Sequence, residues 1–238
     1  MKFTINVDHI ATLRNVRGEE MPDPVTFALM AEQYGVDGIV VHLREDRRHI
    51  TDRDVRLIKE MITTKLDLEM AAEDEIIKIA CEVQPELSTL VPEKREELTT
   101  EGGLNVLDNL EKIKSAINRL HEFDIPVSLF IEPDTDQIDA AAEIAADIIE
   151  IHTGNYANAP TEDEMLDELD RITEAAAHAK KLGLGVNAGH GLNYINMKEF
   201  VNVPNIDEVS IGHAVIARAV FVGLEQAVKE MLALVQGK

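Results

Sequence analysis

Residues 38–70 read GIVVHLREDRRHITDRDVRLIKEMITTKLDLEM, and this stretch decides the fold. Its first run, Gly38 to His42, is apolar up to its last residue, and the run from Leu66 to Met70 alternates apolar with acidic side chains. Between them, Asp52 to Thr63 carries apolar residues at helical spacing behind an aspartate that can cap a helix. The order of strand, helix and strand predicts one unit of a parallel sheet.

The same alternation continues along the chain. Eight short apolar or β-branched runs recur, helical patterns lie between them, and no long hydrophilic linker interrupts the order. This arrangement is typical of an α/β protein built as a closed (β/α)8 TIM barrel, so we predict a single domain over residues 1–238. The predicted strands are Phe3 to Val7, Gly38 to His42, Leu66 to Met70, Leu87 to Val91, Pro126 to Ile131, Asp147 to Ile151, Leu184 to Asn187 and Glu208 to Ile211. The predicted helices include Pro24 to Tyr34, Asp52 to Thr63, Val106 to Phe123, Thr135 to Ala146, Thr161 to Leu182 and Ala214 to Val235.

Composition narrows the class of protein. The formal charge of −22 disfavours nucleic acid or an anionic membrane surface as a partner, and it fits either a solvated surface or a salt-adapted source. Cys81 is the single cysteine, which excludes a disulfide within the chain. The first residues are broken by Asn6 and Asp8 before a signal peptide can form, and no apolar run reaches eighteen residues. We expect a cytoplasmic protein.

Histidines point to the site. Six of the eight lie at, or just past, the ends of predicted strands, where packing alone gives no reason to gather imidazoles. Catalytic groups of such barrels come from the carboxyl ends of the strands and the loops that follow. The sequence therefore predicts a site at this mouth.

Two glutamates lie between apolar residues of predicted strands. Glu69 and Glu150 would be costly to bury unless they are paired or used. A single buried glutamate is often only a hydrogen-bond acceptor, but two of them beside several histidines favour acid–base chemistry. A metal site built from Glu69, Glu150, His152 and His190 is the weaker alternative.

Glycine segments follow the last two predicted strands, at residues 188–191 and 211–214. Many barrels bind phosphate there through loop and helix amides, although glycines also serve turn geometry alone. Arg17 and Arg44 are placed to reach an anion over the mouth, whereas we expect Arg47, Arg48 and Arg53 to pair with acidic surface residues.

A long connection, Pro92 to Asn105, contains paired glycines and is either a lid over the mouth or a plain surface loop. Only Lys94 lies near a strand end, so an amine needed for carbonyl chemistry would have to arrive with a substrate.

Several of these segments together resemble the pyridoxine 5′-phosphate synthase family. The resemblance runs from the first strand to the last helix, and its first two motifs are long and unusual. The matching segments are Asn6 to Asn15, Val41 to Ile50, Leu68 to Ala71, Leu90 to Arg95, Glu150 to Gly154 and Val186 to Gly191.

The resemblance implies a reaction. In this family 3-amino-2-oxopropyl phosphate and 1-deoxy-D-xylulose 5-phosphate condense to pyridoxine 5′-phosphate, releasing phosphate and water. It also implies that no metal or organic cofactor takes part, and that the chains assemble as octamers of barrels with extra helices.

The resemblance assigns roles by position. His42 and Glu69 resemble the family's proton acceptors, His190 its proton donor, and Glu150 the group that stabilises charge in the transition state. The amino-ketone phosphate would be bound by Asn6, Arg17, Gly191, Gly212 and His213. The deoxyxylulose phosphate would be bound by Asp8, His9, Arg44, His49 and Thr99. No role follows for His152.

Two rival hypotheses remain at this stage. One is a metal-dependent barrel aldolase or hydrolase that uses Glu69, Glu150 and His190, and the other is a non-catalytic sensor of sugar phosphates. The sensor is disfavoured because the chain offers more acid–base candidates than binding requires.

Overall fold

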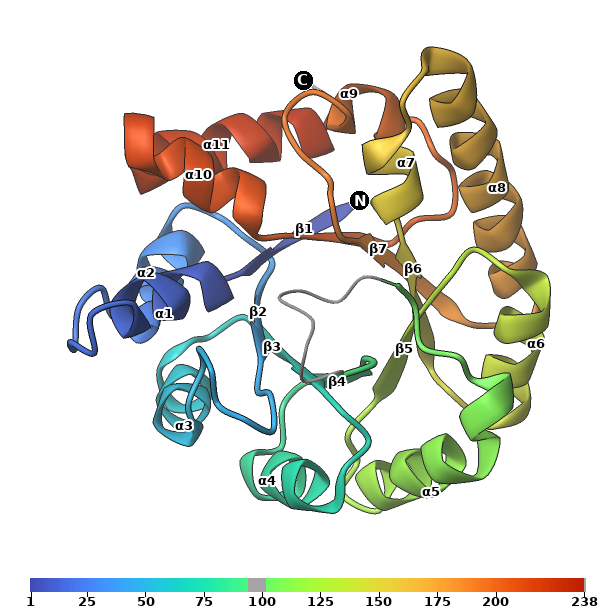
Figure 1. Ribbon diagram of the computed structural model, residues 1–238, viewed down its shortest axis with the longest axis horizontal. Helices are drawn as coiled ribbons and strands as arrows, with labels where there is room; N and C mark the ends of the chain where they lie inside the picture. Colours follow the sequence, from blue (N-terminus) through green and yellow to red (C-terminus); the bar gives the residue numbers. More distant parts are fainter. Residues whose placement is uncertain (94–101, 238) are drawn as a thin grey trace.

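A computed structural model describes residues 1–93 and 102–237 and shows a closed barrel of eight parallel strands (Figure 1). Neighbouring strands pair in sequence order, and β8 pairs with β1 to close the barrel. The predicted TIM barrel is confirmed. The strands are β1 (Lys2–Asn6), β2 (Gly38–His42), β3 (Lys65–Met70), β4 (Leu87–Leu90), β5 (Val127–Ile131), β6 (Ile148–His152), β7 (Gly185–Gly189) and β8 (Glu208–Ile211).

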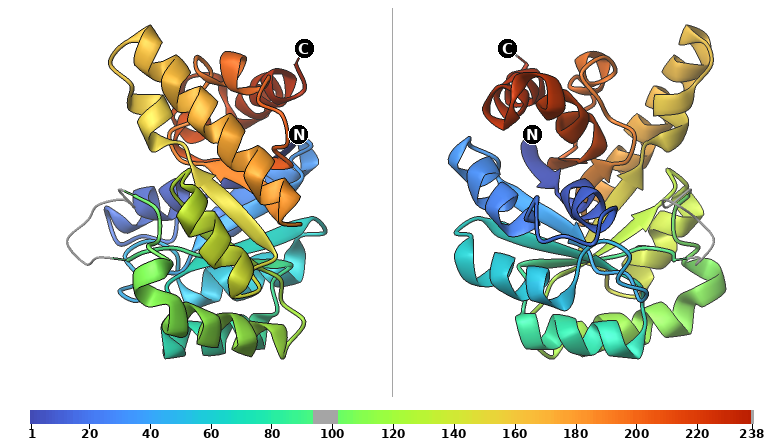
Figure 2. Two further views of the ribbon diagram at one scale, coloured as in Figure 1. Left: turned by 90° about the vertical axis from the view of Figure 1, so that its right-hand side faces the viewer. Right: turned by 60° about the vertical axis from the view of Figure 1, so that its left-hand side comes forward.

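Helices surround the barrel, and the side views show them along the outside of the strands (Figure 2). The longest, α8, packs against β6 and β7. The helices are α1 (Asp8–Asn15), α2 (Pro24–Gln33), α3 (Asp52–Met61), α4 (Asp74–Val83), α5 (Leu110–His121), α6 (Thr135–Glu143), α7 (Gly154–Asn158), α8 (Glu162–Lys181), α9 (Met197–Phe200), α10 (His213–Val222) and α11 (Leu224–Val235). A short 3-10 turn, Leu107–Asn109, precedes α5. The extra helices expected beside the barrel are thus present.

Side-chain capping sets where two of the helices begin. The Asp23 carboxylate accepts a hydrogen bond from Val25 N at 3.2 Å, and Pro24 occupies the first helical position of α2. At the start of α3, the backbone N–H and the hydroxyl of Thr51 both donate to Asp54 Oδ2. Short polar residues therefore end the loops after the first two strands and orient the following helices.

The two faces of each strand have different chemistry. Outward-facing side chains such as Phe3, Leu66 and Leu68 are fully buried against the helices and form the apolar core. Inward-facing positions include charged residues: Lys65 Nζ donates to Glu208 Oε1 at 2.6 Å. The barrel interior is therefore ionisable, in contrast to the layers of branched apolar residues that fill most such barrels.

The predicted C-terminal helix, Ala214 to Val235, is wrong as one element. Gly223 has a φ of +81°, a left-handed conformation that glycine adopts at low cost, and it separates α10 from α11. The two helices then pack side by side (Figure 1). The predicted helix at Val106 also begins later, because its first turn is the 3-10 turn at residues 107–109.

The surface pairs predicted for three arginines are confirmed. Arg47 contacts Asp52 at 3.0 Å, and Arg48 contacts Asp46 at 2.6 Å. Arg53 forms an ion pair with Asp54 at 3.0 Å. Within residues 1–93 and 102–237, no helix is both long and apolar enough to cross a membrane.

Candidate active site

A cavity of about 630 Å³ opens at the carboxyl ends of the strands. Loops after β1, β2, β7 and β8 form its rim, and side chains from inside the barrel form its floor. Most of the predicted site residues line this one cavity: Asn6, Asp8, His9, His42, Arg44, His49, Glu69, Glu150, His190, Gly191, Gly212 and His213. Closure of the barrel therefore brings together residues from both ends of the chain.

Two predicted residues are not placed in the cavity. Arg17 lies on the turn after α1, where its side chain is 79% exposed and its Nε is 3.6 Å from Glu19 Oε1. Thr99 lies outside the described residues, as does most of the predicted lid. Their roles in binding stay predictions.

His42 is held from two sides. Its backbone N–H donates to Asp8 Oδ1 at 2.9 Å, and its ring Nε2 lies 2.9 Å from Glu93 Oε1. Its other ring nitrogen, Nδ1, lies 4.0 Å from Glu69 Oε2. Asn6 Nδ2 completes the group by donating to Asp8 Oδ2 at 3.0 Å. The imidazole therefore stands between two carboxyl groups, an arrangement suited to proton transfer.

Glu150 and Glu69 have strongly shifted acidities. Burial, and then the charges of Asp67 and Glu208, raise the pKa of Glu150 to about 8. Burial, followed by the charges of Glu150 and Asp8, raises the pKa of Glu69 well above its usual range. Close to Glu150, a Cβ at Gly189 would lie 2.2 Å from Glu150 Oε1, so glycine is required beside this carboxyl group. With this pKa, Glu150 is mostly protonated near neutral pH, so its carboxyl group is able to donate a hydrogen bond.

The N-terminus of α10 faces the cavity from β8. Gly212 is the residue before the helix and His213 is its first residue, and both line the mouth, so the positive end of the helix dipole lies at the cavity. A Cβ at Gly212 would lie 3.0 Å from the backbone oxygen of Asn6. The ring of His213 meets that of His9 with centroids 5.2 Å apart. The geometry suits a phosphate group at the end of β8.

The loop after β2 provides a second polar wall. Arg44 is 4% exposed although its side chain carries a positive charge, and it lines the cavity beside His49. Burial lowers the pKa of His49, and the charge of Asp8 opposes that effect. Arg44 therefore brings positive charge to a protein that is strongly acidic elsewhere.

Several ionisable residues around the barrel were not among the predicted site residues. Glu93 contacts His42, and Glu132 contacts His152 Nδ1 at 2.7 Å. Lys65, Asp67 and Glu208 form a deeper group, in which Asp67 Oδ1 accepts a hydrogen bond from Thr89 at 2.8 Å. In the sequence, charged and apolar residues alternate over positions 65–69, and alternate residues of a strand share a face. This pattern already indicated charged side chains inside the barrel.

A candidate cation group occurs among the described residues, and it differs from the set considered from sequence. Ligand atoms of Asp8, His42 and Glu69 lie within 4.8 Å of one another. Both carboxylate oxygens of Asp8 already accept hydrogen bonds, Oδ1 from the backbone N–H of His42 and Oδ2 from Asn6 Nδ2.

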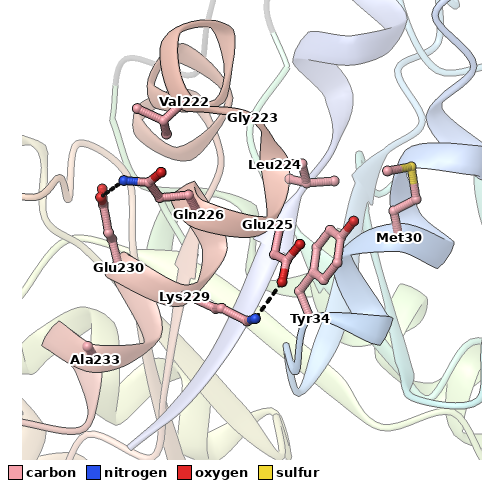
Figure 3. A pocket seen from close by; sticks show the side chains of 10 residues that line it. All are labelled: Met30, Tyr34, Val222, Gly223, Leu224, Glu225, Gln226, Lys229, Glu230 and Ala233. Carbon is pink, nitrogen blue, oxygen red and sulfur yellow. Dashed lines mark hydrogen bonds and ion pairs between the residues drawn. The ribbon is translucent and has the colours of Figure 1, made fainter.

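A second, more open groove of about 820 Å³ lies between α2 and α11 (Figure 3). Its polar contacts are helix surface pairs: Lys229 donates to Glu225 at 2.5 Å, and Gln226 donates to Glu230 at 2.8 Å. These exposed pairs are typical of a helix surface, and they bring no buried acid–base group into the groove. The mouth of the barrel is therefore the candidate active site.

Comparisons with known proteins show the family and the fold of this chain. Residues 3–237 match the family described as pyridoxal phosphate biosynthesis protein PdxJ. The chain is 57% identical to pyridoxine 5′-phosphate synthase of Chlorobium phaeobacteroides over 236 residues, covering 99% of this chain and 100% of the relative. It is 54% identical to the protein of that name from Idiomarina loihiensis, covering 97% and 96%. Phosphoribosyl anthranilate isomerase of Thermotoga maritima shares the fold with a TM-score of 0.64 at 16% identity, over 100% of both chains.

Proposed function

This chain belongs to the family of the pyridoxal phosphate biosynthesis protein PdxJ, and from that premise we propose how its barrel mouth works as an enzyme. The reaction joins 3-amino-2-oxopropyl phosphate to 1-deoxy-D-xylulose 5-phosphate, and it forms pyridoxine 5′-phosphate with loss of phosphate and water. The main observation that supports this proposal is that one cavity, beside a helix N-terminus, is lined by His42, Glu69, Glu150 and His190.

Proton transfers are divided among these groups. His42 and Glu69 accept protons, and the raised pKa of Glu69 makes its carboxylate a stronger base than an exposed glutamate. His190 donates a proton to the leaving oxygen. Several groups suit this reaction because imine formation, phosphate loss, ring closure and dehydration each move a proton.

Glu150 stabilises developing negative charge in its protonated form. With a pKa of about 8, its carboxyl group keeps a proton at neutral pH and can donate a hydrogen bond to an oxyanion. An ionised carboxylate at the same place would repel that charge. The burial of Glu150 therefore contributes directly to its role.

The two phosphates bind to two neighbouring groups of residues at the mouth. Asn6, Gly191, Gly212 and His213 hold the amino-ketone phosphate, where α10 offers its backbone N–H groups. Asp8, His9, Arg44 and His49 hold the deoxyxylulose phosphate, with Arg44 supplying the positive charge. Arg17 and Thr99 are assigned to the same two substrates by family position alone.

The amine for the imine comes from the substrate. Among the described residues that line the mouth there is no lysine, and Lys65 is bonded to Glu208 inside the barrel. A Schiff base with the enzyme is therefore not part of the proposed sequence. The amino group of 3-amino-2-oxopropyl phosphate takes that part.

We propose that the chain folds as one domain over residues 1–238. We also propose that the enzyme works in the cytoplasm and assembles into an octamer. Exposed apolar residues at the C-terminal end of α10 support contacts between copies: Val220 is 75% exposed and Phe221 is 84% exposed. Light scattering of the purified protein measures the assembly, and a monomer would contradict it.

One assay tests the reaction. The purified protein is mixed with both phosphates, and formation of a pyridine chromophore and release of phosphate are followed together. We expect both signals to require both substrates and to persist after exhaustive chelation. Loss of activity on chelation would favour a metal-dependent enzyme, and binding without any product would favour a sensor.

A further inference from the structure

His152 lies just behind the candidate site and has no role in the proposed reaction. It ends β6, it is 4% exposed, and its Nδ1 lies 2.7 Å from Glu132 Oε1. Burial is the largest single effect on the pKa of Glu132 and raises it, but the hydrogen bonds from His152 and Gly103 N, with the charges of His152 and Arg171, together lower the pKa. Glu132 is therefore a carboxylate that only accepts, so Nδ1 of His152 carries the hydrogen.

The other ring nitrogen of His152 has no partner. Nε2 is buried and makes no hydrogen bond with any residue in the described parts of the chain. In the neutral ring this atom is an acceptor, and burying a polar atom without a partner destabilises the folded protein. Room around it is kept by Gly154, because a Cβ there would lie 2.4 Å from His152 Nε2 and 3.3 Å from His190 Cδ2. The space next to Nε2 is thus shared with His190.

The ring of His190 packs beside that of His152. Its ring centroid is 5.0 Å from that of His152, and the two planes are tilted by 57°. Phe130 packs against both rings, with centroids 5.2 Å from His152 and 6.4 Å from His190. The rings of His152 and His190 therefore pack together beside Phe130.

The backbone of His190 is fixed by the neighbour of His152. Thr153 Oγ1 donates to the carbonyl oxygens of Gly189 at 2.8 Å and of His190 at 2.6 Å. His190 itself has a φ of +77°, a conformation that most residues avoid. The site therefore holds the backbone of His190 in a strained conformation and leaves its ring to be oriented by side chains.

We propose that Glu132 and His152 are positioning residues for His190, with His152 Nε2 accepting a hydrogen bond from the His190 ring nitrogen that faces away from the substrate. This role rests on the proposed function, in which His190 donates a proton. When cationic His190 gives its cavity-facing proton to the leaving oxygen, the ring becomes neutral and keeps one N–H. That N–H donates to His152, whose Nδ1–H donates to Glu132, so no proton has to move beyond His190.

The pKa of His190 depends on both His152 and Glu132. Burial lowers the pKa of His190, a positive charge on His152 lowers it further, and Glu132 raises it. Arg171 is a further charged residue that acts on Glu132. Replacing Glu132 by neutral glutamine therefore lowers the pKa of His190.

Kinetics of Glu132→Gln test the pair. We expect kcat to fall on the order of tenfold, since part of a general acid's contribution is lost, while KM for both phosphates stays nearly unchanged. The high-pH limb of the kcat profile should move to lower pH, because His190 loses its proton earlier. If Glu132 had only a structural role, the substitution would reduce the fraction of active enzyme but would leave the high-pH limb of the kcat profile at the same pH.

The matched control is Glu143→Gln, which removes the same charge from an exposed position at the end of α6. We expect wild-type kinetics from it. If the wild-type protein forms the pyridine chromophore and Glu132→Gln matches it in kcat and pH profile, the pairing is wrong. If the wild type itself forms no product, the proposed function has failed instead.

A measurement on the wild-type protein covers the case in which the variant does not fold. Nitrogen NMR of 15N-histidine-labelled protein, assigned with His152→Asn and His190→Asn, reports which ring nitrogen carries hydrogen. We expect His152 to carry hydrogen on Nδ1 throughout the neutral pH range. Hydrogen on Nε2 in the neutral ring would overturn the proposal, because Nε2 would then not accept from His190.

Discussion

The two faces of β2 and β3 differ more sharply than any two elements of this barrel. The outward residues Val41 and Leu68 are fully buried in apolar contacts with the helices. The inward residues His42, Asp67 and Glu69 are ionisable, and each has a polar partner elsewhere in the barrel: Glu93 in the loop after β4, Thr89 on β4 and Asn6 on β1, respectively. Because alternate residues of one strand face opposite ways, stability and chemistry are kept on separate faces of the same strands.

The largest expected effect comes from the inward face. His42→Ala should lower turnover by roughly 10²–10⁴-fold, the usual contribution of a general acid or base, while deoxyxylulose-phosphate binding stays mostly intact. Steady-state kinetics and calorimetric binding measure the two quantities. His178→Ala, on the exposed face of α8 beside Asp139, is the control and should keep full turnover. Near-normal turnover of the His42 variant would remove His42 from its assigned role.

A substitution on the outward face should lower the stability of the protein and leave its turnover largely unchanged. Leu68→Ala leaves a cavity between β3 and the helices and should reduce the free energy of unfolding by about 2–5 kcal/mol. Turnover per folded molecule should change far less than in the His42 variant. Urea unfolding followed by circular dichroism measures the first quantity, and Leu166→Ala on α8, where the side chain is 45% exposed, is the control. A loss of turnover as large as that of His42→Ala would show that the two faces are not separate.

The ionisation of Asp67, a buried residue on the inward face, should make the free energy of unfolding depend on pH. Its burial, opposed by Lys65, raises its pKa from 3.8 to about 7, so the folded protein holds this proton while the unfolded chain has lost it. The resulting stabilisation is present at low pH and is lost as the pH rises from about 4 to about 7, at about 1.4 kcal/mol per pKa unit. The free energy of unfolding should therefore fall between pH 5 and pH 8.

Asp67→Asn should reduce that fall, because asparagine does not titrate. Unfolding free energies at the two pH values provide the measurement, and the exposed Asp170→Asn on α8 should behave like the wild type. An unchanged pH dependence in Asp67→Asn would mean that Asp67 ionises as easily in the folded state as in the unfolded chain.

The smallest expected effect concerns Glu93, which supports the inward face from the loop after β4. It accepts from Glu45 N at 3.2 Å as well as contacting His42, and glutamine keeps its shape without its charge. Glu93→Gln should lower kcat on the order of tenfold, since His42 stays in place with weaker orientation. The kcat of Glu93→Gln is compared with that of the exposed control variant Glu122→Gln. Equal turnover in the two variants would show that Glu93 has only a structural role.

Much of the candidate site follows from local sequence. The polar end of each predicted strand marks the mouth, and that is where His42, Glu150 and His190 line the cavity. The alternation in residues 65–69 also indicated inward carboxyl groups. Boundaries were less accurate: Gly223 ends α10 because its backbone leaves the helical conformation, although the apolar pattern continues past it.

Local sequence determined the order of strands and helices, and hence the barrel and the edge where its polar residues gather, because side-chain period and turn residues act over a few positions. Only the tertiary structure decided the pairs: Glu93 with His42, Glu132 with His152, and Lys65 with Glu208 across 143 positions. It also decided that Arg17 is exposed. Such pairs depend on how the closed barrel sets distant strands in register, and no local pattern encodes that register.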